Sequence, residues 1–363
     1  MKCGIVGLPN VGKSTLFNCL SNAKAQSANY PFCTIEPNLG TVSVPDRRLN
    51  VLEDLVKPER VVPAVVEIVD IAGLVKGASK GEGLGNQFLA NIRECDAIIH
   101  VLRCFDNGNI VHVEGSVNPI RDKEIIDTEL QLKDLETLTK ATDKAKKFIK
   151  SGKKEDILTY ETLQALQKFV EDGRNAREFE TNDLTKPIVD EVHLLTNKPI
   201  LYVCNVDEAS IKNGNEWVEK VREMAAQEGA EVVVLAAQIE ADINELETYD
   251  ERQMFLEELG LDEPGVNRLI RSAYDLLQLQ TYFTAGVKEV RAWTIGKGWT
   301  APQAAGVIHT DFEKGFIRAE VIKFDDFVNF GSEAKVKEAG KMGVEGKEYI
   351  VQDGDIMHFR FNV

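Results

Sequence analysis

The sequence contains no apolar run near the roughly 18 residues that a membrane-spanning helix requires, so we expect no membrane partner. Its six cysteines form no C-x-x-C pair. Scattered cysteines favour reduced thiols over a disulfide framework or a zinc site. The apolar stretch Cys3–Val6 is too short for a signal peptide. Together these absences predict a soluble, cytoplasmic protein, which we expect to be a monomer.

Positive charge is also scarce. Lys and Arg total 43 against 59 Asp and Glu, for a net charge of −16. A chain this acidic has no general attraction for RNA, DNA or an anionic membrane, so any nucleic-acid contact must be local. One short stretch has the opposite character, with seven lysines opposed only by Asp143. It is either a solvated surface or a contact for RNA phosphates; its lysines are Lys140, Lys144, Lys146, Lys147, Lys150, Lys153 and Lys154.

Short runs rich in Val and Ile recur along the chain and alternate with longer, helix-like stretches. This alternation is typical of a parallel sheet that helices bury on both faces. It predicts an α/β fold with a mostly parallel sheet. The runs are Cys3–Val6, Val65–Val69, Ala97–Leu102, Pro199–Cys204 and Glu231–Ala236.

The pattern changes between residues 122 and 196, where apolar residues recur at helical spacing. Ser151 and Gly152 interrupt this stretch, which predicts an antiparallel, coiled-coil-like helical hairpin inserted into the α/β domain. The apolar positions expected to face inward are Leu132, Leu135, Leu138, Leu163, Leu166 and Val170.

The C-terminal end has a third pattern. Lys288–Ile295, Phe316–Phe324 and Glu348–Asn362 are expected to be strands of a small mixed or β-rich domain. We therefore expect an α/β domain over 1–121 and 197–277, a helical insertion over 122–196, and a β-rich domain over 278–363.

The segment Gly7–Ser14 matches the phosphate-loop pattern G-x-x-x-x-G-K-[ST] and lies between an expected strand and an expected helix. In such a loop, backbone N–H groups and a helix N-terminus bind phosphate oxygens. We expect Lys13 to reach the β- and γ-phosphates and to support catalysis, and Ser14 to bind Mg²⁺. The candidate nucleotide-binding residues here are Asn10, Val11, Gly12, Lys13, Ser14 and Thr15.

Two further segments complete the expected phosphate site. Asp70 ends a Val-rich run, which is where a carboxylate that orients Mg²⁺ is found, and it begins a D-x-x-G sequence that ends at Gly73. Gly73 would donate its N–H to the γ-phosphate. Thr34 is placed to bind Mg²⁺ when a γ-phosphate is present; otherwise it is a loop threonine without a ligand.

These motifs, with Tyr30-Pro31-Phe32 and the glycine-rich continuation after Leu74, resemble the Obg branch of translation-factor-type P-loop NTPases. The finer resemblance is to the YchF family of Obg-like ATPases, and it covers essentially the whole chain. It implies ATP hydrolysis, Mg²⁺, a TGS-like β-grasp domain at the C-terminus and association with ribosomes. The expected partner is the large subunit or the assembled ribosome, with the lysine-rich stretch contacting rRNA.

The base-recognition segment departs from the N-K-x-D pattern of guanine-specific relatives. Here Asn205 is followed by Val206, Asp207 and Glu208, and Asn205 and Glu208 are the candidate residues that contact the nucleotide base. Val206 lacks the lysine stem that packs along the purine, and Glu208 places its carboxylate one methylene further out. A displaced carboxylate loses much of its discrimination for guanine, so we expect ATP to be preferred over GTP.

Cleavage of the γ-phosphate needs a group that positions water. Ras-like enzymes use a glutamine where this sequence has Leu74, which forms no hydrogen bond, so slow turnover is expected. Asn10 is either a ligand of K⁺, as in related potassium-dependent NTPases, or a cap for its turn. His112 matches the position proposed as catalytic in the YchF family; the alternative is an ordinary packed or solvated histidine.

The sequence thus predicts a slow, Mg²⁺-dependent ATPase that acts as a nucleotide-dependent switch on the ribosome, in translation or stress regulation. Two alternatives stay open at this point. One is a GTPase of ribosome assembly. The other is a nucleotide-gated module that binds ribosomes or RNA and in which hydrolysis is incidental.

Overall fold

The computed structural model describes residues 1–26, 39–71 and 84–362, which form two compact units. Within these ranges one unit contains residues 1–23, 39–40 and 67–273, and the other contains residues 24–26, 41–66 and 274–362. The predicted limits instead place 41–66 with the α/β domain. The difference arises because β3 (Val61–Val62) pairs with β9 (Val290–Gly296), a contact that sequence patterns do not reveal.

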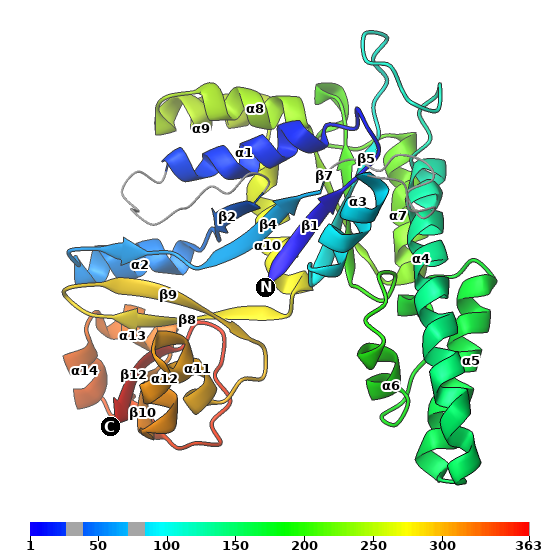
Figure 1. The fold of residues 1–363 in the computed structure, drawn as a ribbon. Coiled ribbons are helices and arrows are strands. Elements are labelled where there is room, and N and C mark those ends of the chain that lie inside the picture. The colour runs from blue at the N-terminus through cyan, green and yellow to red at the C-terminus, as the bar shows by residue number, and fades with distance from the viewer. Residues whose placement is uncertain (27–38, 72–83, 363) are drawn as a thin grey trace. The chain divides into compact units, whose positions relative to one another are not determined.

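One six-stranded sheet has the order β2-β4-β1-β5-β6-β7 (Figure 1), and its strands β1, β5, β6 and β7 belong wholly to the first unit. All five predicted runs are strands of this sheet, and the neighbours from β4 to β7 pair in parallel, as predicted. Every residue of β5 and β6 is buried, because helices cover both faces. The bounds are β1 Lys2–Val6, β2 Leu39–Ser43, β4 Val65–Asp70, β5 Ala97–Arg103, β6 Ile200–Asn205 and β7 Glu231–Leu235.

The helices of this unit connect the strands and form the hairpin. Among the described residues, no helix is both long enough and apolar enough to pass through a bilayer. Their bounds are α1 Lys13–Gln26, α3 Leu84–Arg93, α4 Pro119–Phe148, α5 Lys154–Glu171, α6 Lys186–Glu191, α7 Glu216–Glu228, α8 Ala237–Glu245, α9 Tyr249–Leu259 and α10 Gly265–Leu276.

The predicted hairpin is α4 and α5, which pack against each other on either side of Gly152 (Figure 1). Helix α4 starts with its side-chain cap at Asn118 and with Pro119 at the first position, two strong start signals. Leu138, Leu163, Leu166 and Val170 are buried between the helices, as expected. Leu132 is not: it is 45% exposed, because at this level α4 turns Asp127, Glu129 and Asp134 inward instead.

A buried ionic cluster fixes the root of the hairpin to the sheet. Lys123 of α4 pairs with Asp127 at 2.9 Å and with Glu228 of α7. Glu228 also accepts hydrogen bonds from Arg177, at 3.3 Å, and from the Tyr202 hydroxyl of β6, at 2.8 Å. Burial alone would raise the pKa of Asp127, but the positive charges of Arg177 and Lys123 outweigh this effect. The pKa of Asp127 is therefore lowered. The carboxylate therefore stays charged, and the hairpin is held by paired charges.

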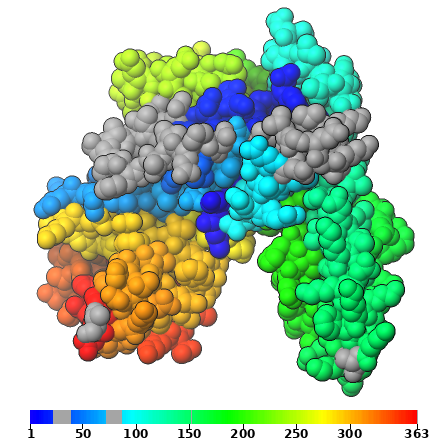
Figure 2. All heavy atoms as spheres, in the orientation of Figure 1, coloured from blue at the N-terminus to red at the C-terminus, as the bar shows by residue number. Residues whose placement is uncertain are grey.

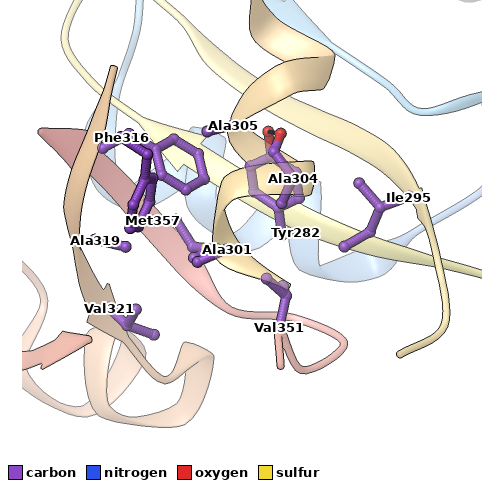
Figure 3. Packing of buried hydrophobic residues seen from close by; sticks show 11 residues of the cluster. Tyr282, Ile295, Ala301, Ala304, Ala305, Phe316, Ala319, Val321, Val351 and Met357 are labelled. Carbon is purple, nitrogen blue, oxygen red and sulfur yellow. Dashed lines mark hydrogen bonds between the residues drawn. The ribbon is translucent and has the colours of Figure 1, made fainter. Parts of the chain in front are cut away.

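The second unit has its own six-stranded sheet, of order β11-β10-β12-β8-β9-β3. A core of Tyr282, Ile295 and Phe316 packs against three alanines of α11 (Figure 3). This mixed sheet confirms the prediction of a small β-rich domain; the TGS-like assignment stays a prediction. The other bounds are α2 Arg47–Val56, β8 Leu279–Ala285, α11 Ala301–Ile308, α12 Thr310–Lys314, β10 Phe316–Ile322, α13 Phe324–Phe330, α14 Glu333–Glu338, β11 Gly343–Glu345 and β12 Ile356–Phe361.

The last predicted strand is shorter than expected. Strand β12 covers only Ile356–Phe361; before it, Ile350 makes a single β-bridge with Thr300, and the following residues form a loop around the buried Asp355. That carboxylate accepts hydrogen bonds from Lys323 and from the Tyr349 hydroxyl, both at 2.6 Å. Gly354 makes the turn with a φ of +89°. The prediction of a strand from Glu348 was wrong because these polar contacts curl the chain before β12 begins.

His100 lies in the middle of β5, with its ring 5.8 Å from that of Tyr202. Neither ring nitrogen has a hydrogen-bond partner among the described residues. Complete burial lowers the pKa of His100 from 6.5 to about 4, because a charged imidazolium cannot be solvated there. Between these two values the unfolded chain binds a proton that the folded chain does not. The folded state therefore loses stability as the pH falls from 6.5 towards 4.

We expect a His100→Leu variant to lose less stability than the native chain over this pH range, by on the order of 2–3 kcal/mol. Urea unfolding at pH 7 and pH 4.5 measures the difference. His358→Leu, the same substitution at an exposed position of β12, is the matched control. Coincident pH profiles for the native and His100→Leu proteins would contradict the assignment.

Candidate nucleotide-binding site

The loop Gly7–Gly12 joins β1 to α1 and has the backbone shape of a phosphate loop. Asn10 and Gly12 adopt positive φ values of 64° and 93°. A Cβ on Gly12 would lie 2.2 Å from Nδ2 of Asn205, so both space and conformation require glycine there. The carbonyl of Gly12 accepts from the N–H of Leu16 at 3.0 Å, which places Gly12 at the start of α1. The N-terminus of α1 therefore opens onto the loop.

Asn205, at the end of β6, connects the phosphate loop to the segment after β7. Its Nδ2 donates to the Val11 carbonyl at 2.9 Å, and its Oδ1 accepts from the Ala237 N–H at 2.8 Å. The side chain is buried, so both hydrogen bonds lie away from water. In this structure the amide of Asn205 positions the loop, which is a different role from the expected contact with the nucleotide base.

Lys13 and Asp70 meet although they are 57 residues apart. Asp70 ends β4 and lies level with Ile5 of β1, so the parallel pairing brings its carboxylate beside the loop. The Nζ of Lys13 and Oδ1 of Asp70 form an ion pair. Ser14 is exposed in the first turn of α1. The Ser14 hydroxyl and the Asp70 carboxylate are oxygen donors of the kind that Mg²⁺ prefers, so the residues present fit that ion.

A cavity of about 480 Å³ lies next to the loop, at the carboxyl ends of β5, β6 and β7. Such an edge is where open parallel sheets bind ligands. Val206 and Glu208 line it, so the structure brings the predicted base-recognition segment to the phosphate loop. Four other lining residues were also predicted from the sequence, namely Asn10, Gly12, Thr15 and Asn205. Sequence reasoning missed several more, although the end of the fifth Val-rich run marks some of them; they include Phe105, Asn107, Ile110, Ala236, Ala237, Gln238 and Asp242.

The segment that carries His112 contacts the phosphate loop through its neighbour. Nδ2 of Asn10 donates to the Val111 carbonyl at 3.1 Å, which ties the loop to this segment. His112 itself is buried, and its Nε2 lies 2.8 Å from Oδ2 of Asp122 in the first turn of α4. Sequence reasoning missed Asp122, because an acidic residue near a helix start is normally exposed.

Several predicted site residues lie outside the described residues. These are Thr34, Gly73, Leu74, the segment Tyr30–Phe32 and most of the glycine-rich continuation. The expected contacts of Thr34 with Mg²⁺ and of Gly73 with the γ-phosphate stay predictions.

The fold and this site define a P-loop nucleoside triphosphatase domain. Residues 2–162 match the family model MMR_HSR1, described as 50S ribosome-binding GTPase, and residues 279–362 match YchF-GTPase_C, described as a protein of unknown function (DUF933). The chain is 58% identical over 362 residues to the ribosome-binding ATPase YchF of Haemophilus ducreyi (strain 35000HP / ATCC 700724), covering 100% of this chain and 99% of the relative.

Two further comparisons agree. The ribosome-binding ATPase YchF of Bacillus subtilis (strain 168) is 56% identical over 365 residues, with 100% of both chains covered. The solved structure of the Schizosaccharomyces pombe YchF GTPase is 37% identical, has a TM-score of 0.89, and covers 99% of this chain and 97% of that one. The chain belongs to the YchF family.

We expect Asn205→Ala to lower the free energy of unfolding by about 2–4 kcal/mol, because it leaves two buried backbone groups without partners. The variant should also bind nucleotide more weakly, since the phosphate loop loses its support. Urea unfolding and nucleotide titration measure the two effects. Asn213→Ala, at an exposed loop position, is the control. Unchanged nucleotide affinity in Asn205→Ala would show that the loop does not need this bridge.

Proposed function

We propose that this protein is a Mg²⁺-dependent ATPase that acts as a nucleotide-dependent switch on the ribosome. The observation that carries the proposal is the meeting of the phosphate loop, Lys13 and Asp70 at one edge of the parallel sheet. The names of the relatives support it, since the H. ducreyi and B. subtilis proteins are called ribosome-binding ATPases. A ribosome partner supports a cytoplasmic location, and we propose that the chain acts there as a monomer.

Lys13, Asp70 and Ser14 would have separate roles in binding the phosphates and the metal ion. Lys13 would exchange its contact with Asp70 for the β- and γ-phosphates, which frees the carboxylate to hold the metal ion together with Ser14. Backbone N–H groups from Asn10 to Thr15 would bind phosphate oxygens. Bound Mg²⁺ would supply positive charge that stabilises the nucleoside diphosphate as it leaves. The expected roles of Thr34 and Gly73 belong to the same proposal.

Two residues that line the cavity beside the loop favour adenine over guanine as the bound base. A guanine-specific site needs a carboxylate fixed at the right depth to accept from two guanine N–H groups. Glu208 is longer than aspartate and lies exposed in the 3₁₀ turn η4 (Glu208–Ser210), whose cap is Asp207. Val206 is buried and supplies an apolar wall with no stem along the base. The rival function, a GTPase, is favoured by the MMR_HSR1 family, which is described as a ribosome-binding GTPase, and by the S. pombe relative, which is called a GTPase.

Hydrolysis assays with purified protein test the proposal. We expect a higher kcat/KM for ATP than for GTP, and a loss of at least about a hundredfold in Lys13→Ala, because the variant lacks the cation that stabilises the transferred phosphoryl group. Lys220→Ala, at an exposed position of α7, should keep full activity. A higher kcat/KM for GTP would select the GTPase alternative, and no turnover of either nucleotide would select the binding module.

Two residues are proposed to replace the missing glutamine. Asn10 has its amide N–H₂ engaged with Val111, which leaves its amide oxygen as the atom that would bind K⁺. His112 would position or deprotonate the attacking water, and it lies next to the residue that contacts the loop. Leu74 cannot do this work, since its side chain forms no hydrogen bonds.

The lysine-rich end of the hairpin is proposed to bind rRNA phosphates. All seven of its lysines are exposed, and Phe148 beside them is 55% exposed. In the space-filling view the hairpin projects away from the rest of its own unit (Figure 2). An exposed aromatic ring among lysines suits RNA, where bases stack and phosphates attract cations.

We expect the fourfold variant Lys144→Gln, Lys146→Gln, Lys147→Gln, Lys150→Gln to bind ribosomes at least about tenfold more weakly near 100 mM salt. Its affinity should also depend less on salt, because fewer counterions are released. Cosedimentation over a salt series measures both. The control neutralises four exposed lysines of the second unit, Lys335, Lys337, Lys341 and Lys347. Equal losses in both variants would show a general charge effect and contradict a site at the hairpin end.

A further inference from the structure

Both ring nitrogens of His112 are occupied. The side chain is 5% exposed, its Nδ1 accepts from the N–H of Glu114 at 3.1 Å, and its Nε2 faces Oδ2 of Asp122 at 2.8 Å. A backbone N–H can only donate and a carboxylate only accepts, so the ring proton lies on Nε2. In this arrangement the imidazole has no lone pair to offer to a water molecule.

Asp122 is itself firmly held. Its side chain is 1% exposed, and its second oxygen, Oδ1, accepts from Nε and Nη2 of Arg121 at 3.2 and 2.9 Å. Arg121 also donates to the carbonyl and hydroxyl of Ser116, at 2.6 and 3.1 Å. The carboxylate lies in the first turn of α4, where the helix dipole favours negative charge. His112 is therefore fastened to the root of the long hairpin helix.

The two valines on either side of His112 are exposed, although His112 itself is buried. Val111 is 76% exposed and Val113 is 49% exposed, while the histidine between them is buried. The usual preference is the reverse, since valine is more often buried than histidine. The segment thus exposes two apolar side chains while the His112–Asp122 hydrogen bond is buried. The Val111 carbonyl meanwhile contacts Asn10 of the phosphate loop, so the ring lies one residue from the nucleotide site.

This geometry differs from that of a catalytic Asp–His pair. In a serine-protease triad the aspartate holds one ring nitrogen and leaves the other free to accept a proton. Here the other nitrogen, Nδ1, is already occupied by the Glu114 N–H. Because both ring nitrogens form hydrogen bonds, His112 cannot act as a base in this conformation.

We propose that Asp122 is a positioning residue that holds His112 in an inactive, buried state, and that the Nε2–Asp122 hydrogen bond must break before hydrolysis. The inference rests on the proposed ATPase function. Once the ring is released from Asp122 and from the Glu114 N–H, its Nδ1 accepts a proton from water as the water oxygen attacks the γ-phosphorus. The bond from that phosphorus to the β–γ bridging oxygen breaks, and the products are ADP and phosphate. Asp122 contacts neither the phosphate loop nor the cavity among the described residues, so it acts only through His112.

The variant Asp122→Asn tests the inference, because the amide keeps the shape of the carboxylate and loses its charge. We expect kcat for ATP to rise at least threefold while KM changes less than twofold. The double variant Asp122→Asn, His112→Gln should show no rise. Asp134→Asn is the matched control: it is another buried acid of α4 and accepts from the Leu195 and Thr196 N–H groups. Its kcat should not change. An unchanged or lower kcat in Asp122→Asn would overturn the proposal.

A measurement on the native chain covers the case in which Asp122→Asn does not fold. Nitrogen NMR of histidine-labelled protein reports the ring tautomer, and His112→Gln identifies the signal among the five histidines. We expect the Nε2–H tautomer in the nucleotide-free protein, and the Nδ1–H tautomer would overturn the proposal. If neither the native chain nor any variant hydrolyses ATP, the ATPase function fails, and the tautomer alone decides whether Asp122 holds His112.

Discussion

The parallel pairing of β1 with its neighbours β4 and β5 is the constraint on which the candidate site depends. Because the strands run in the same direction, their carboxyl ends meet at one edge, and Asp70 arrives level with the strand that leads into the phosphate loop. The ion pair between Lys13 and Asp70 follows from that register. A slip of one residue would turn the carboxylate to the other face of the sheet and separate the two groups.

A second set of contacts holds the loop from the opposite side. Asn205 fills the space that a side chain at position 12 would need, and connects the loop to the segment after β7. The phosphate loop is thus held between β4 and β6 before any ligand arrives. Such preorganisation lowers the cost of binding, since less conformational freedom remains to be lost.

Buried charge gives the hairpin its own fixed attachment. Removing two charges from water is expensive, and only good partner geometry repays the cost. Lys123, Arg177 and Glu228 meet that condition through several short contacts at the root of α4. The same first turns of α4 carry Asp122, so the attachment of the hairpin and the state of His112 depend on one helix. The lysine-rich end of α4 lies more than fifteen residues further along that helix.

Much of this arrangement could be predicted from local sequence. The Val-rich runs became strands because parallel strands buried on both faces need continuous apolar residues, and the glycines of the phosphate loop mark a backbone shape that few residues adopt. Apart from the phosphate-site motifs, contacts between distant residues could not be predicted. Leu132 was expected inside but is exposed, while Asp134 is buried and accepts from the Leu195 and Thr196 N–H groups. The pairing of His112 with Asp122 is of the same kind, and so is the addition of β3 to the second sheet.

The central claim is that Lys13 and Asp70 separate when a nucleotide binds, one taking phosphate and the other taking metal. Titration calorimetry of ATP with and without Mg²⁺, on the native chain and on Asp70→Asn, tests this most directly. The account predicts that Mg²⁺ tightens ATP binding to the native chain at least about tenfold, and that Asp70→Asn loses most of this gain. Equal effects of Mg²⁺ on the two proteins would contradict it.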